Sequence, residues 1–243
     1  MIDREALFDD DYLFFYEERL DDDRSDREAE LIWRLLELEP GMDVLDLACG
    51  HGRIANRLAE RGARVTGLDA TPMFLERARA DAAAGGLEVE YVEGDMRELP
   101  WEERFNAIVN WFTAFGYFDD DAEDRRVLDA AHRALRPGGR LLIENNNLTE
   151  LLPRWQDVVV VERDGDVSID RARFDPVTGR SRTARLIVRG GRTRRIEFSV
   201  RMFIAVELRQ WLLDAGFSSV ESYDGEGEPL TAHGSRMITI GRR

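Results

Sequence analysis

Short apolar runs alternate with helical patterns through the middle of the chain. Five runs have the length and composition of buried strands, and in most of the segments between them apolar residues recur every three or four positions, as on one face of a helix. The strand runs are DVLDLA, ARVTGLDA, LEVEYVEGD, FNAIVNWF and RLLIENN. Successive β-α units of this size predict parallel strands, right-handed crossovers and helices on both faces of the sheet.

The pattern changes after about residue 153, where strand-like, partly alternating segments follow one another without a helical segment between them. Turn-forming residues separate them, including Asp164-Gly165 and Gly190-Gly191, which are typical of tight hairpins. The sequence therefore predicts an antiparallel meander. A helical segment, AVELRQWLLDAG, and two strands, FSSVESY and SRMITIGRR, then resume the α/β pattern.

These patterns predict an α/β fold class: a doubly wound, mostly parallel seven-stranded sheet with an antiparallel last strand, plus an inserted antiparallel β-meander. The predicted organisation has three parts. Residues 1–40 form an N-terminal helical lead-in or lid, residues 41–152 and 204–243 form a ligand-binding α/β domain, and residues 153–203 form the meander. We expect the meander to cover a substrate or to make the contact of a homodimer.

Composition excludes several kinds of site and partner. Cys49 is the single cysteine among 243 residues, which excludes an internal disulfide and a multi-cysteine zinc site, and we predict no metal centre. The net charge of −15 argues against a nucleic-acid partner. No run reaches the ~20 apolar residues of a membrane-spanning helix. The acidic N-terminus lacks the pattern of a leader peptide, so we expect a cytoplasmic protein without membrane contact.

A glycine turn follows the first strand of the α/β pattern. Gly50-His51-Gly52 begins a stretch that fits G-x-G-x-x-[G/A], in which glycine lets a ligand approach the backbone closely. Asp69 ends the second strand, where a carboxylate can accept hydrogen bonds from both hydroxyls of a ribose. Since ligands of open α/β sheets bind beyond the carboxyl ends of the strands, both features belong to one site. NAD and S-adenosylmethionine each contain adenosine, and both satisfy these features.

Two further acids distinguish between these ligands. Asp46, inside the first strand, would repel the pyrophosphate of NAD, whereas it would attract the ammonium group of a methionine. Asp95 follows the third strand, where it can accept from the exocyclic amine of adenine while Met96 packs on the ring. The three acids together favour S-adenosylmethionine.

These features resemble the Rossmann-like, class I methyltransferases that depend on S-adenosylmethionine, in particular their small-molecule members. The resemblance covers roughly residues 42–145, in the ordered stretches VLDLACGHGRIA, VTGLDATPMFLERAR, VEGDMRELP, FNAIVNWFTAFGYF and RALRPGGRLLIE. It implies a cofactor site with the following residues: Asp46, Ala48, Gly50 and Gly52 at the methionine part, Asp69 at the ribose, Ala70 or Met73 against the adenosine, Asp95 and Met96 at the adenine, and Asn110 and Trp111 beside the sulfonium.

Methyl transfer from a sulfonium is an in-line displacement, in which the protein chiefly aligns the reactants and excludes water. His233 is the best candidate for a general base among the three histidines, because the loop that contains it is expected at the cofactor edge of the sheet. Tyr16 of the lead-in is a candidate lid residue in the active site. We expect a small-molecule acceptor, with N- and O-methylation both open, and the arginines of the meander favour an anionic one.

Three alternatives stay open at this point. The first is a methyltransferase that acts on RNA or protein through the arginine-rich meander. The second is an NAD(P)-dependent oxidoreductase. The third is a binding module that senses the cofactor without catalysis.

Overall fold

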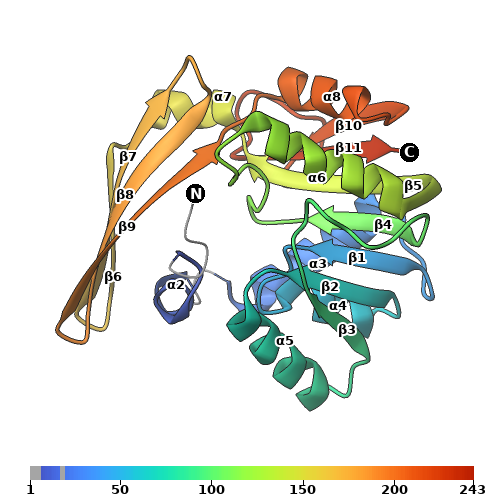
Figure 1. Ribbon diagram of the computed structural model, residues 1–243, viewed down its shortest axis with the longest axis horizontal. Helices are drawn as coiled ribbons and strands as arrows, with labels where there is room; N and C mark the ends of the chain where they lie inside the picture. Colours follow the sequence, from blue (N-terminus) through green and yellow to red (C-terminus); the bar gives the residue numbers. More distant parts are fainter. Residues whose placement is uncertain (1–6, 17–19) are drawn as a thin grey trace.

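The structure, a computed structural model, describes residues 7–16 and 20–243, and its largest element is a seven-stranded sheet (Figure 1). The strand order is β10-β11-β5-β4-β1-β2-β3. In chain order the strands are β1 (Asp43–Leu47), β2 (Arg64–Asp69), β3 (Val89–Glu93), β4 (Phe105–Asn110), β5 (Leu135–Asn146), β10 (Ser219–Asp224) and β11 (Arg236–Arg242). Neighbours from β5 to β3 are parallel, and β11 is antiparallel to both β5 and β10. The predicted fold class is confirmed.

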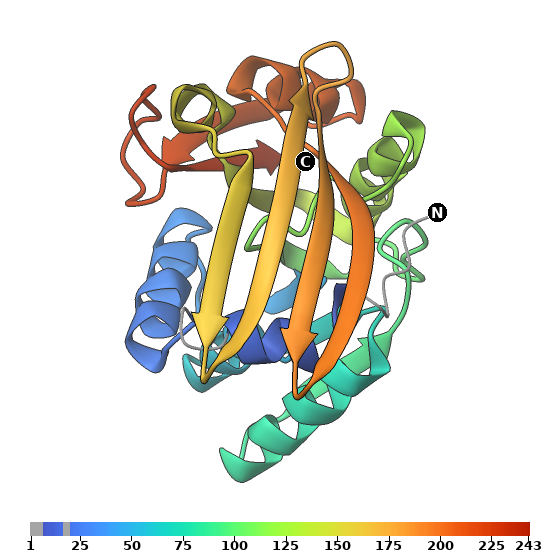
Figure 2. The same ribbon diagram turned by 90° about the vertical axis from the view of Figure 1, so that its left-hand side faces the viewer.

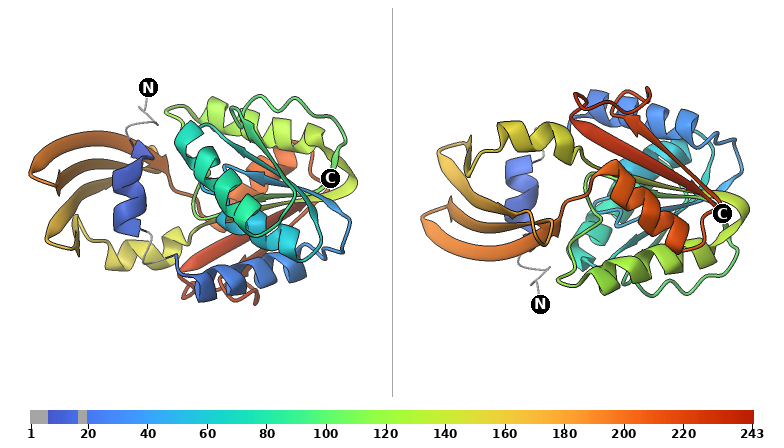
Figure 3. Two further views of the ribbon diagram at one scale, coloured as in Figure 1. Left: turned by 90° about the horizontal axis from the view of Figure 1, so that it is seen from below. Right: turned by 90° about the horizontal axis from the view of Figure 1, so that it is seen from above.

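Helices cover both faces of this sheet (Figure 3). On one face pack α3 (Asp22–Leu35), α4 (Arg53–Glu60) and α5 (Pro72–Ala84), and on the other α6 (Asp121–Ala134) and α8 (Ala205–Asp214). Alternate residues of the central strand β1 enter the two cores, Val44 on the first face and Leu45 on the second. Burial on both faces explains why the central strands β1 and β4 are mainly apolar.

A second, four-stranded antiparallel sheet stands beside the carboxyl ends of the parallel strands, after a short connection through α7 (Leu148–Leu151) and the 3-10 turn η2 (Leu152–Arg154). It consists of β6 (Val158–Arg163), β7 (Asp166–Asp175), β8 (Arg180–Arg189) and β9 (Arg192–Arg201), in that order across the sheet. Figure 2 shows its outer face, with β6 and β9 at the two edges. The short helix α2 (Asp10–Tyr16) lies between the two sheets (Figure 1).

Gly52 shows how the glycine turn is fitted to the sheet. It precedes α4 with a φ of 81°, in the left-handed region. A Cβ at this position would overlap the hydroxyl oxygen of Tyr91 and would lie 2.9 Å from Cβ of Ala78. The Tyr91 hydroxyl donates a 2.6 Å hydrogen bond to Asn56 of α4, so it cannot move away without breaking a buried bond. Gly52 is therefore required by the packing of α4 on β3 and α5.

We predict that Gly52→Ala destabilises the protein strongly. Gly86→Ala is the matched control, because Gly86 also has a positive φ, of 66°, but no atom lies within 4 Å of a Cβ built there. The control should lose about 1 kcal/mol from backbone strain alone, and Gly52→Ala should lose a further ~1–3 kcal/mol from overpacking. Urea unfolding measures both values. Equal losses for the two variants would show that the space beside Gly52 is not restricted.

Candidate functional site

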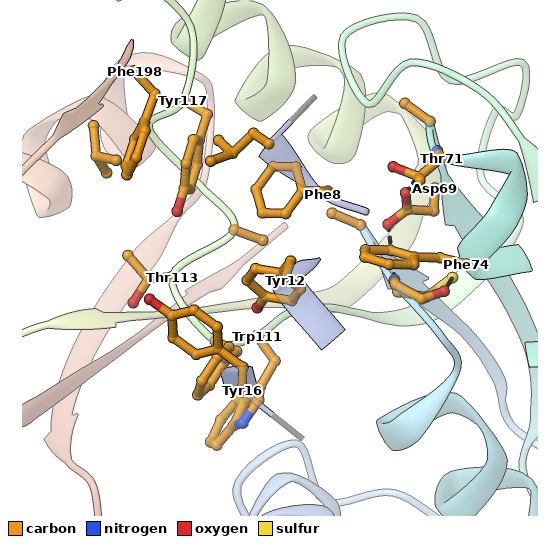
Figure 4. A pocket seen from close by; sticks show the side chains of 18 of the residues that line it. Phe8, Tyr12, Tyr16, Asp69, Thr71, Phe74, Trp111, Thr113, Tyr117 and Phe198 are labelled. Carbon is orange, nitrogen blue, oxygen red and sulfur yellow. Dashed lines mark hydrogen bonds between the residues drawn. The ribbon is translucent and has the colours of Figure 1, made fainter. Parts of the chain in front are cut away.

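A cavity of about 530 Å³ lies beyond the carboxyl ends of the parallel strands, between the seven-stranded sheet, α2 and the inner face of the second sheet. Its lining has two parts. The glycine-turn half includes Asp46, Ala48, Gly50, Asp69, Ala70 and Phe74, and the aromatic half includes Phe8, Tyr12, Tyr16, Tyr117, Arg185 and Phe198 (Figure 4).

Asp46 is a buried carboxylate on the cavity wall. It is 2% exposed, and its Oδ2 has no hydrogen-bond donor among the described residues. Burial raises the pKa of Asp46 to about 7, although the charge of Arg53 and the backbone N–H of Ala55 act in the opposite direction. An unpartnered carboxylate oxygen is costly in such a place, and a cationic group in the cavity would compensate it.

Asp69 connects two loops at the edge of the sheet. Its Oδ2 accepts a 2.8 Å hydrogen bond from the backbone N–H of Gly50, and its Oδ1 accepts a 2.9 Å bond from the N–H of Thr71. Burial raises the pKa of Asp69, and these N–H groups limit the rise. The carboxylate still lines the cavity beside Thr71, where it can accept a hydrogen bond from a ligand hydroxyl (Figure 4).

A half-buried ion pair lies next to the glycine turn. Arg53 of α4 lines the cavity and contacts Glu28 of α3 at 2.6 Å. The indole N–H of Trp111 donates to the same carboxylate at 2.9 Å. Burial acts to raise the pKa of Glu28, but the Arg53 charge and the hydrogen bonds from Arg24, Trp111 and Arg53 hold it below its usual value. This network joins α3 and α4 to the end of β4.

Aromatic rings from three parts of the chain meet in the aromatic half. Tyr12 stacks on Tyr16 with 4.7 Å between ring centroids, and Phe8 touches both Tyr12 and Tyr117 edge-on. Tyr117 in turn stacks on Phe198 of β9, at 6.4 Å. Burial raises the pKa of Tyr117 to about 12 and that of Tyr12 further, so both hydroxyls stay protonated at neutral pH.

A second ion pair forms the wall behind these rings. Arg185 of β8 lies opposite Asp170 of β7 and binds it through two hydrogen bonds of 2.7 Å. The same guanidinium donates to the hydroxyl of Tyr16 at 3.0 Å and lies over the ring of Phe198. Arg185 is only 6% exposed, so the geometry of Tyr16 is fixed by a buried charged group.

The structure brings most of the residues predicted from the sequence to this cavity. Those on its wall are Asp46, Ala48, Gly50, Asp69, Ala70, Met96, Trp111 and Tyr16. Five others do not line it: Gly52, Met73, Asp95, Asn110 and His233.

Local contacts explain these placements. Both carboxylate oxygens of Asp95 accept hydrogen bonds from Arg97, at 2.9 and 2.6 Å. The side-chain amide of Asn110 donates to the carbonyl of Leu47 and so joins β4 to β1. His233 is exposed in the loop between β10 and β11, and this position does not support the role of general base that its sequence context suggested.

Several lining residues were not selected from the sequence, above all Phe74, Arg53 and the Asp170–Arg185 pair. Phe74 is the third residue of α5, which begins at Pro72. It therefore lies on the first turn of this helix, where its side chain lines the cavity. Asp170 and Arg185 meet through the register of the β7–β8 hairpin, which local sequence patterns do not specify.

Comparison with known proteins agrees with this geometry. Residues 44–139 match a family described as a methyltransferase domain. The chain is 29% identical to the cypemycin N-terminal methyltransferase of a Streptomyces species, over 82% of each chain. Several further curated relatives are matched over about half of their own length.

Solved structures are similar over nearly the whole chain. The CcbJ methyltransferase of Streptomyces caelestis superposes with a TM-score of 0.77 at 25% identity, over 90% of this chain and 88% of that one. The sugar N-methyltransferase KedS8 from a Streptoalloteichus species has a TM-score of 0.66 at 25% identity, over 90% and 87%. Together these similarities support a class I methyltransferase that depends on S-adenosylmethionine.

The residues of the glycine-turn half fit S-adenosylmethionine. The orphaned Oδ2 of buried Asp46 suits an ammonium group, and the Asp69 carboxylate on the cavity wall suits a ribose hydroxyl.

No helix in the described part of the chain is long and apolar enough to cross a membrane. Residues 7–16 and 20–243 contain no cluster of three or more His, Cys, Asp or Glu side chains suited to a metal ion.

We predict opposite effects of Asp46→Asn on cofactor affinity and stability. Loss of the charged acceptor should weaken binding of S-adenosylmethionine by ~1.5–3 kcal/mol, measured by calorimetry. Because the pKa of Asp46 is about 7 when folded and lower when unfolded, the folded state binds more protons between these values. This group's contribution to stability therefore falls as pH rises through that window.

The cofactor-free Asp46→Asn protein should consequently melt at a higher temperature than wild type at pH 8, with a smaller difference at pH 5. Asp95→Asn is the control, since Asp95 lies outside the cavity and should leave cofactor affinity unchanged. An Asp46→Asn variant that binds as tightly as wild type would remove Asp46 from the cofactor site.

Proposed function

We propose that this protein transfers a methyl group to an amine nitrogen of a small acceptor held in the aromatic half of the cavity. The observation that supports this most directly is the set of polar groups there: tyrosine hydroxyls with raised pKa and a carboxylate already bound by Arg185. Such groups form hydrogen bonds well but accept a proton poorly.

The glycine-turn half would hold the cofactor. Asp46 would bind the ammonium group, Asp69 the ribose, and Ala70 and Phe74 would pack against the adenosine. When bound, S-adenosylmethionine supplies an electrophilic methyl group with a neutral thioether as leaving group.

The chemistry of the aromatic half favours nitrogen over oxygen. A neutral amine attacks through its lone pair, a carbon–nitrogen bond forms as the carbon–sulfur bond breaks, and the proton leaves the product ammonium afterwards. A tyrosine oxygen such as that of Tyr16 can accept a hydrogen bond from an amine N–H, which leaves the lone pair directed at the methyl group. An alcohol would need a general base to become a comparable nucleophile.

The charges of the cavity do not support the anionic acceptor expected from the sequence. Each arginine on the described part of the wall is bound to a carboxylate: Arg53 to Glu28, Arg185 to Asp170 and Arg236 to Glu144. The aromatic faces and hydroxyls instead suit an uncharged or cationic acceptor that carries hydroxyl groups.

The relatives support an amine acceptor of one of two kinds. KedS8 is named a sugar N-methyltransferase, and the cypemycin enzyme an N-terminal methyltransferase. We favour the compact, sugar-like amine, because α2 and the second sheet enclose the aromatic half.

We further propose that residues 7–16 serve as the lid. Ion pairs of Asp9 and Asp11 with Arg189 and Arg194 of the second sheet would hold it in place.

An acceptor panel tests the proposal. Purified enzyme and S-adenosylmethionine are incubated with amino sugars, with the matching sugars that have hydroxyl in place of the amine, and with short peptides. We expect mass spectrometry to find N-methyl products from amino sugars only. Methylated peptides would favour the second kind of acceptor, whereas methylation of the hydroxyl sugars alone would overturn the choice of nitrogen.

Tyr16→Phe tests the aromatic half separately. Removal of the hydroxyl that Arg185 holds should lower kcat/KM for the amine by about tenfold, the value of one lost hydrogen bond of ~1.4 kcal/mol. The Kd of S-adenosylmethionine should not change. His233→Ala serves as the control and should keep the wild-type rate; a slow His233→Ala variant together with a normal Tyr16→Phe variant would reverse the two assignments.

A further inference from the structure

The second sheet has one open edge that is almost wholly apolar. β6 pairs with β7 on one side, and no described strand pairs with its other side. Four valines, residues 158–161, occupy most of this edge strand. Val158 and Val160 are 51% and 50% exposed. An exposed apolar edge strand is prone to pair with another chain, and soluble proteins usually block it.

The other edge strands of this protein are blocked by charge. β3 contains Glu90 and Glu93, β10 contains Glu221 and Asp224, and β9 contains arginines at positions 192, 194 and 195. β6 differs from all three, because its charged residues, Glu162 and Arg163, both stand at its carboxyl end. Its apolar edge therefore points to a partner strand rather than to water.

The hydrogen-bond pattern shows which residues face outward. The N–H of Ala172 in β7 donates to the carbonyl of Asp157, and Asp157 lies opposite Ala172 by continuation of the register. In an antiparallel pair the bonded positions alternate, so Val159 and Val161 also bond to β7. The main-chain groups of Val158, Val160 and Glu162 consequently point away from the sheet.

We propose that β6 pairs antiparallel with β6 of a second copy of this chain, about a two-fold axis at Val160. A two-fold axis makes every contact twice, and an antiparallel strand pair satisfies it without distortion. In this register Val160 of one chain lies opposite Val160 of the second copy. Val158 then forms main-chain hydrogen bonds with Glu162 of the second copy, and Val159 lies opposite Val161 of that copy.

Charge supports this register. Asp157 falls opposite Arg163 of the second copy, on the same face of the joined sheet, and opposite charges in such cross-strand pairs are stabilising. A shift of the axis by one residue to Val161 would place Val159 opposite Arg163 and remove this match. The pairing joins the two second sheets into one continuous antiparallel sheet and leaves Asp170 and Arg185, on β7 and β8, facing their own cavity.

Oligomeric state gives the first test. Wild-type protein at about 50 µM should have the mass of a dimer by light scattering during size-exclusion chromatography. Val160→Lys should be monomeric and should still bind S-adenosylmethionine, because Val160 does not line the cavity. Val177→Lys is the matched control: Val177 is 92% exposed in the β7–β8 turn, and this variant should stay dimeric. A monomeric wild type, or a dimeric Val160→Lys variant, would overturn the proposal.

Cross-linking tests the register itself. The single native cysteine, Cys49, is buried, so an introduced cysteine reports without interference. Bonded antiparallel partners have Cα atoms about 5.5 Å apart, within the range of a disulfide. Val160→Cys should therefore form a covalent dimer under mild oxidation. Val158→Cys should not form a covalent dimer, since the Cα atoms of the two introduced cysteines would be ~14 Å apart. Equal cross-linking of the two variants would contradict the axis at Val160.

Discussion

The site depends on the carboxylate of Asp69 and its two backbone hydrogen bonds. One bond holds the N–H of Gly50 in the turn after β1, and the other holds the N–H of Thr71 at the start of α5. The ends of two neighbouring parallel strands are thereby fixed relative to each other. Gly50, Ala70 and Thr71 lie beside these bonds on the cavity wall, and the Asp69 carboxylate itself lines the cavity.

The fold and half of the site were predictable from sequence because they follow from local patterns. Alternation of apolar strands with helical segments gives the doubly wound sheet, and parallel strands necessarily end at one edge. Asp46, Gly50 and Asp69 lie at that edge for this reason alone. The turn residues Asp164-Gly165 and Gly190-Gly191, with positive φ, likewise specify the hairpins of the second sheet.

The remaining half depends on contacts that local patterns do not contain. Asp95 occupies an equivalent strand end, yet Arg97, two residues later, binds its carboxylate outside the cavity. The spacing of Gly52 fits a ligand loop, but Tyr91 from a different strand fills the space beside it. Asp170 and Arg185 meet only through the register of β7 and β8, so the aromatic half emerges from tertiary structure.

The most direct test of this account is a crystal structure with S-adenosylhomocysteine. We expect its amino group within hydrogen-bond distance of Asp46 Oδ2, its ribose hydroxyls on Asp69, and its sulfur facing the ring cluster of Tyr12, Tyr16 and Tyr117. An acceptor nitrogen would then have one open approach, through the aromatic half. A bound product that leaves Asp46 Oδ2 without a partner, or a sulfur directed away from the tyrosines, would contradict the division of the cavity into a cofactor half and an acceptor half.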